Sequence, residues 1–192
     1  MKTFKLNKVS LPSRRYDFSS GPNGPTILSG DVSKFTPDKP DVTLHQSGSD
    51  FKGPVVAASF ISRERKTLQV GICPPGFKEM EWHSLHRGRR SDTYSFPFVL
   101  DDERKLNLTW KKKGLLDGGF GFRLTDDRGG VVAEFTRNMT VFESAGSLEV
   151  SASMGMRFET MVFISLCAII EKKRRNDSGG AKMANVGARL AT

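Results

Sequence analysis

The sequence predicts a mainly β protein in which a closed antiparallel barrel of about twelve strands surrounds a buried hydrophobic C-terminal α-helix. Three observations carry this prediction. Short runs of alternating or β-branched residues recur up to residue 152, and turn residues separate them. One apolar helix follows, with its uninterrupted apolar or small stretch at 161–170. The apolar residues of this helix lie on every side, which is typical of a helix enclosed by protein.

The candidate strands recur at a spacing of about 8–12 residues, as in an all-β sandwich or barrel. Segments rich in Gly, Pro, Ser and Asp separate them, such as S-S-G-P-N-G-P and T-P-D-K-P. The predicted strands lie at 3–9, 26–32, 42–45, 55–61, 67–72, 81–85, 93–99, 105–110, 121–124, 131–136, 140–143 and 148–152.

Two of these pairs are predicted to form hairpins. In 120–136, alternating runs flank D-D-R-G-G, where Gly129 and Gly130 supply the positive φ of a tight turn. In 94–110, Y-S-F-P-F-V-L leads through D-D-E-R into K-L-N-L-T-W. Pro97 weakens the first strand of this second hairpin or places it at a sheet edge, because proline donates no hydrogen bond to a ladder.

The helix is predicted at about 155–175, with Ser153 as a candidate N-cap. The cations at 172–175 suit its negative end, and N-D-S-G-G is expected to stop it. Residues 176–192 are expected to form a disordered basic tail. Ten apolar residues are too few to span a bilayer, which needs about 20. A flat sheet would cover one side of the helix, whereas a closed barrel covers all sides and removes the sheet edges.

Composition favours one soluble globular domain, at 1–175. The hydrophobic fraction is 37%, the charged fraction is 27% and the formal net charge is +9. A basic balance favours anionic partners, although a basic protein can also lack one. Cys73 and Cys167 do not make a disulfide framework, and the N-terminus does not read as a secretory signal. The expected location is therefore cytoplasmic, with peripheral membrane or nuclear location as alternatives.

Basic clusters are the main candidates for a binding site. Four occur, in S-R-E-R-K, R-G-R-R, W-K-K-K and E-K-K-R-R, and the last also suits helix-end compensation. Lys and Arg clusters hold phosphates, and three like charges in a short loop repel unless something offsets them. The predicted anion- or lipid-binding residues are Arg87, Arg89, Arg90, Lys111, Lys112 and Lys113.

Other motifs give little support to metal binding or catalysis. His83 and His86 are three apart in a predicted strand, so they are expected on opposite faces rather than at one metal. The glycine stretches lack the G-x-x-x-x-G-K-[ST] pattern, and no G-x-S-x-G, H-E-x-x-H or C-x-x-C occurs. We expect no enzyme activity, no metal site and no cofactor.

The chain resembles the tubby C-terminal-like superfamily, which includes tubby proteins, phospholipid scramblases, LURP-one-related plant proteins and many fungal proteins. The resemblance covers most of 1–175, and it is strongest to the fungal tubby-like proteins, whose roles are largely unknown. It implies a twelve-stranded barrel around a hydrophobic C-terminal helix. The segments that carry it are D-V-T-L-H (41–45), S-F-P-F-V-L-D-D-E-R-K-L-N-L-T-W (95–110), R-L-T-D-D-R-G-G-V-V-A-E-F (123–135) and M-V-F-I-S-L-C-A-I-I (161–170).

Functions differ among the members of this superfamily. Tubby proteins bind phosphatidylinositol bisphosphate through basic residues on the barrel surface. Scramblases carry a calcium-binding segment and a cysteine cluster, and neither is present in this chain. We therefore expect a non-catalytic domain that docks to an anionic phospholipid surface, in particular phosphoinositides. The alternative is a protein-interaction or scaffold domain without a lipid role. Nucleic-acid binding is disfavoured, because the alternation of aromatic and basic residues that makes a base-stacking face is missing.

Overall fold

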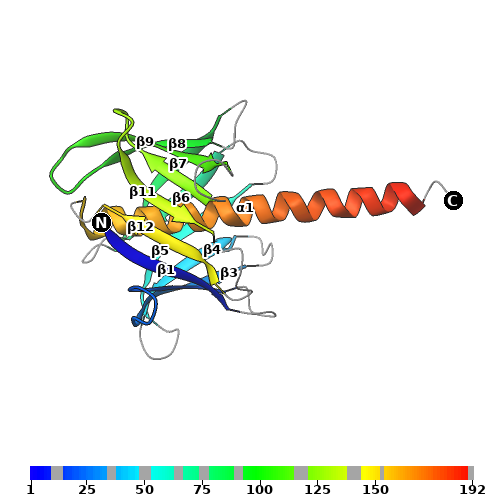
Figure 1. Ribbon diagram of the computed structural model, residues 1–192, viewed down its shortest axis with the longest axis horizontal. Coiled ribbons are helices and arrows are strands. Elements are labelled where there is room, and N and C mark those ends of the chain that lie inside the picture. Colours follow the sequence, from blue (N-terminus) through cyan, green and yellow to red (C-terminus); the bar gives the residue numbers. More distant parts are fainter. Residues whose placement is uncertain are drawn as a thin grey trace.

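The computed structural model has twelve antiparallel strands that close into a barrel around one helix (Figure 1). It describes residues 1–9, 15–33, 38–47, 53–62, 67–73, 78–88, 93–114, 121–137, 144–151 and 154–189. The strands are β1 (Lys2–Val9), β2 (Arg15–Ser19), β3 (Thr26–Val32), β4 (Val42–Gln46), β5 (Val55–Ile61), β6 (Thr67–Ile72), β7 (Glu81–Arg87), β8 (Thr93–Val99), β9 (Lys105–Lys113), β10 (Gly121–Thr125), β11 (Val131–Thr136) and β12 (Ser144–Val150), and the helix is α1 (Gly155–Arg189).

Each strand pairs with its neighbours in the sequence, and β1 closes the barrel by pairing with β12. The predicted fold class is confirmed. Eleven of the twelve strands overlap predicted ones; β2 was missed, and the predicted strand at 140–143 lies outside the described residues. In β2, R-Y-D-F-S places the buried Tyr16 and Phe18 two residues apart, so its alternation was visible in the sequence.

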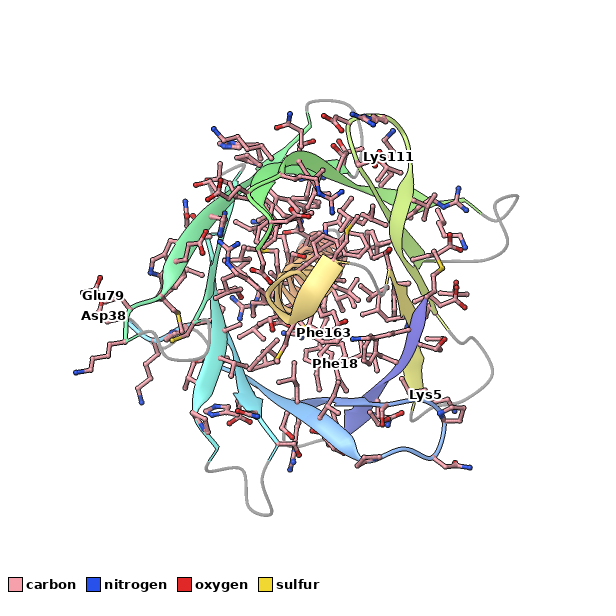
Figure 2. The ribbon with its side chains drawn as sticks, turned by 90° about the vertical axis from the view of Figure 1, so that its left-hand side faces the viewer. Lys5, Phe18, Asp38, Glu79, Lys111 and Phe163 are labelled. Atoms are coloured by element: carbon pink, nitrogen blue, oxygen red, sulfur yellow. The ribbon has the colours of Figure 1, made fainter. Side chains whose placement is uncertain are left out.

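The helix fills the barrel, as Figure 2 shows in a view along the axis. Every residue from 161 to 169 is buried, which is the all-round enclosure that the sequence predicts. Phe163 is a central contact: its ring centroid lies 5.0 Å from that of Phe4 and 4.5 Å from that of Phe18. The Trp110 Nε1 donates to Ser165 Oγ at 2.9 Å, which fixes the helix against β9.

The two ends of the barrel differ in what the helix does there. At one end, which we call the entry rim, the helix begins, and Arg157 and Glu159 bond to Glu81 and Lys2. At the other end, the exit rim, it leaves, and Lys172 and Arg175 bond to loop and strand-end groups. The odd-numbered strands end at the exit rim, because successive strands are antiparallel and β1 starts at the entry rim.

The helix continues well past its predicted end. It runs to Arg189, and its last part projects from the exit rim (Figure 1). The segment N-D-S-G-G was expected to stop it, and 176–192 was expected to be disordered. Glycine costs about 1 kcal/mol per residue in a helix but leaves the backbone hydrogen bonds possible, and only proline removes a donor. No proline follows residue 155, so the backbone can continue as helix.

Candidate anion-binding rim

The exit rim holds the described members of both predicted basic clusters. Arg87 ends β7, and Lys111, Lys112 and Lys113 end β9. The intervening β8 pairs with both strands: Arg87 lies opposite Tyr94, which lies opposite Trp110. Adjacent strands are about 4.8 Å apart, so the backbones at Arg87 and Trp110 are separated by about 10 Å. Arg89 and Arg90 lie outside the described residues.

The side chains of this sector divide between two faces of the wall. Arg87 occupies the same row as the buried Tyr94 and Trp110, and Lys112 lies opposite Phe122, which packs in the core. Both cations therefore project at the mouth of the barrel, where the strands end and their side chains are exposed. Lys111 is exposed on the outer wall, opposite Thr93 and Arg123 (Figure 2).

Lys113 differs from its two neighbours. Its side chain is only 4% exposed, and its ammonium donates a hydrogen bond to Glu134 Oε1. Arg123 Nε donates to the other oxygen of Glu134 at 2.9 Å. The hydrogen bond from Lys113, with that from Arg123, outweighs the opposing effect of burial and lowers the pKa of Glu134. Lys113 is therefore engaged in the wall between β9 and β11 and is a poor candidate for contact with a ligand.

The helix adds cations that the sequence analysis assigned to helix-end compensation. Lys172 Nζ donates to the Ser62 carbonyl at 2.5 Å, and its side chain is buried. Burial, and then the charges of Arg87 and Arg175, lower the pKa of Lys172. Lys172 thus lies within electrostatic range of Arg87, although 85 positions separate them in the sequence. Barrel closure alone brings them together, so no local motif could have revealed this pair.

Carboxylates offset part of this charge. Arg175 donates to Glu171 at 2.7 Å, to Asp41 at 2.5 Å and to the Ser33 carbonyl at 3.2 Å. Arg174 bonds to both oxygens of Glu171 at 2.6 Å. Burial alone would raise the pKa of Glu171, but these two arginines outweigh it and lower the pKa. This network closes the barrel around the departing helix and leaves the β7–β9 sector as the most basic part of the described exit rim.

The entry rim has the opposite character. Its turns 100–104 and 126–130 each contain two adjacent Asp residues, and Glu79 and Glu81 lie at the start of β7. Among the residues that the structure describes, carboxylates outnumber Lys and Arg at this end, and cations outnumber carboxylates at the exit rim. The charge of the described residues is therefore polarised along the barrel axis, with its positive end where α1 leaves.

The histidines lie as the strand offset predicts. His83 faces inward and packs near Phe98, with ring centroids 5.5 Å apart, and His86 is exposed on the other face. Within the described part of the chain, no three metal-ligating side chains come together. Cys73 and Cys167 are both free thiols. None of the described helices has the length and apolarity needed to cross a membrane.

Comparisons with known proteins add no relative. No protein-family model, no curated protein and no solved structure matches this chain.

Proposed function

We propose that this protein is a non-catalytic binding domain that docks to anionic phospholipid, with phosphoinositide headgroups as the preferred ligand. The docking surface is the β7–β9 sector of the exit rim, which we define as Arg87, Lys111 and Lys112. The resemblance of the sequence to the tubby superfamily points in the same direction.

One observation carries the proposal: the β7–β8–β9 register gathers exposed cations from two separate sequence clusters onto one rim. Arg87, Lys111 and Lys112 are exposed, and the buried Lys172 adds positive potential beside Arg87. A guanidinium and two ammonium groups can together bind the several phosphates of one headgroup. Near an anionic surface each such residue contributes about 1 kcal/mol, and the contribution falls off within a Debye length.

The path of α1 restricts how a membrane can approach. The helix continues from the exit rim to Arg189 along the barrel axis (Figure 1). A flat bilayer cannot lie squarely across this rim, because the projecting helix would hold it away. We therefore expect the sector to meet the surface from its flank, with α1 running beside the membrane.

Vesicle binding tests the proposal. The wild-type chain is expected to partition onto vesicles of neutral lipid with a few per cent phosphoinositide more strongly than onto neutral vesicles, and less so as salt rises. The triple variant Arg87→Gln, Lys111→Gln, Lys112→Gln is expected to lose about 3 kcal/mol, or roughly a hundredfold in partition coefficient. Cosedimentation at several lipid concentrations measures both.

A matched triple variant on the entry rim controls for net charge. Lys78, Lys105 and Arg128 are exposed, and changing all three to Gln removes the same charge from the other end. This variant is expected to retain most of the wild-type binding. Equal losses in the two triples, or equal wild-type partition onto neutral and anionic vesicles at low salt, would contradict the proposal.

A second candidate function, binding of a protein partner, has an observation of its own. Phe60 and Trp82 lie on the outer wall of the barrel, 37% and 45% exposed, with ring centroids 5.4 Å apart. Exposed aromatic side chains of this kind are common energetic centres of protein interfaces. A partner that stays bound well above physiological salt, and that is lost with Trp82→Ser but kept by the exit-rim triple variant, would favour this alternative.

A further inference from the structure

One side of the barrel carries almost no charge along its strands. The strands β4, β5, β6 and β8 contain no Asp, Glu, Lys or Arg, and β7 has them only at its two ends, as Glu81 and Arg87. Each of the other strands contains at least one such residue. In the described turns that join β4–β8, the charged residues lie at the rims. We call the outer face of β4–β8 the neutral wall.

Two aromatic side chains are exposed on the neutral wall. Phe60 of β5 and Trp82 of β7 contact each other across β6, with ring centroids 5.4 Å apart. Gly71 of β6 lies opposite Trp82 in the ladder, and a Cβ at this glycine would come within 2.9 Å of the indole Cε3. The indole therefore rests against the backbone of β6, and the pair forms a low apolar platform on the wall.

The polar side chains around this platform bond to each other. Gln69 Nε2 donates to Ser84 Oγ at 2.8 Å, and the hydroxyls of Ser95 and Thr109 are 3.0 Å apart, on β8 and β9. A polar group that keeps its partner costs little when it is removed from water, whereas a charged side chain costs far more. The neutral wall can therefore be covered at a low cost in lost hydration.

The neutral wall borders the proposed docking sector. Arg87 ends β7 at the exit rim, and Lys111 lies on the outer wall of β9 opposite Thr93 of β8. A flat surface that covers the neutral wall from its flank thus meets these cations along the exit-rim edge. An anionic bilayer offers phosphates at its surface and an apolar region directly below them. Tryptophan is enriched at this boundary, because its ring is apolar and its N–H is polar.

From this arrangement we infer that the neutral wall is the face that lies on the bilayer, with Phe60 and Trp82 inserted at the level of the headgroups. Arg87 and Lys111 then bind phosphates beside the inserted rings. The inference rests on the proposed lipid function and adds to it an apolar contact and an orientation. In this orientation the axis of α1 runs along the membrane, which agrees with approach from the flank.

Tryptophan fluorescence on the full chain tests the insertion. The chain has two tryptophans, and Trp110 is fully buried and bonded to Ser165, so only Trp82 can reach lipid. The vesicles are neutral lipid with a few per cent phosphoinositide, with or without bromine near the glycerol end of the acyl chains. We expect bromine to quench the bound wild-type chain and to leave Trp82→Phe unquenched. The remaining emission of Trp110 reports that this variant is folded.

Partition onto the unbrominated vesicles tests the contribution of each ring. Phe60→Ser and Trp82→Ser are each expected to lower the partition coefficient by about tenfold, because a half-exposed aromatic ring no longer leaves water on binding. Val131→Ser is the matched control: Val131 is about as exposed as Phe60, but it lies on β11, outside the neutral wall. This control is expected to bind as wild type does.

The outcomes separate this inference from the proposed function. If the wild-type chain cosediments with phosphoinositide vesicles but bromine leaves its emission unchanged, the insertion is overturned and the lipid function stands. If the chain binds no anionic vesicle, both are overturned. Equal losses of binding in Trp82→Ser and Val131→Ser would also overturn the insertion. A protein partner that shields Trp82 from a soluble quencher, without any effect of bromine, would assign the two rings to that partner instead.

Discussion

Identical residue types acquire different roles in this barrel according to the groups that their side chains can reach. Lys111 is exposed on the outer wall, whereas Lys113, two positions on, is buried against Glu134. Ser165 in the helix likewise has a role that its partners set. It is the polar member of an apolar run, and its hydroxyl accepts from Trp110 and donates to the Val162 carbonyl at 3.1 Å. Both Trp110 and Ser165 are fully buried, so this bond has no water to replace it.

Removing that hydroxyl tests the value of the bond. Ser165→Ala leaves the indole N–H of Trp110 buried without its acceptor, and we expect a loss of about 1–3 kcal/mol in the free energy of unfolding. Urea denaturation measures it. Ser95→Ala is the matched control, because Ser95 bonds Thr109 at 3.0 Å on the exposed face, and it should change stability by no more than about 0.5 kcal/mol. An equal loss of stability in both variants would show that the buried hydrogen bond stabilises the fold no more than the exposed one.

The helix α1 has two parts with different surroundings. Up to Arg175 its described contacts are with the barrel wall, and they end in the ion-pair network of Glu171, Arg175 and Asp41. Beyond Arg175 the backbone projects from the exit rim (Figure 1). The inner part owes its stability to burial on all sides, whereas an isolated helix of the length of the outer part is marginal in water.

Two truncations should separate these parts. A chain that ends after Arg175 is expected to unfold within about 0.5 kcal/mol of the full-length chain. A chain that ends after Ile170 also loses Glu171, Lys172 and Arg175. The Asp41 side chain, which is only 13% exposed, then has no guanidinium partner, and the free energy of unfolding should fall by about 3 kcal/mol or more. Denaturant midpoints give both values. If the chain that ends after Ile170 is as stable as the chain that ends after Arg175, the network does not close the barrel.

At the scale of the whole molecule, barrel closure creates sites from residues that are far apart in the sequence. It brings Arg87 near Lys172 at one end, and it brings Arg157 to Glu81 and Val99 at the other. At the exit rim, the pKa of Glu171 is lowered from 4.5 by Arg174 and Arg175, so this carboxylate is protonated only below its ordinary pKa.

Acidification should therefore destabilise the fold at the exit rim through Glu171. The carboxylate of Glu171 stabilises the fold fully above pH 4.5, and this contribution is lost as the pH falls through its lowered pKa. Glu171→Gln is expected to be less stable than wild type at neutral pH and to show a shallower loss below pH 4.5. Thermal melts across pH measure this. A slope below pH 4.5 that is identical in wild type and Glu171→Gln would refute the assignment of this loss of stability to Glu171.

The sequence by itself determined the barrel, its helix and most of its strands. Period-2 alternation marks strands whatever their partners are, and an apolar stretch at 161–170 with no polar side requires an enclosure. The short β2 and the continuation of α1 past Gly180 were not predicted. In both places, residues that favour turns are present, but such residues do not exclude a strand or a helix.

The tertiary structure decided everything that depends on register and closure. It placed Arg87 and Lys111 on one rim, turned Lys113 into a wall residue, and added Lys172 to the basic sector. It also placed Pro97, predicted only as a weak or edge position, on the part of β8 that does not pair with β7. The physical reason is the same in each case: a strand sequence specifies which face a side chain occupies, but only the pairing of strands specifies what stands opposite.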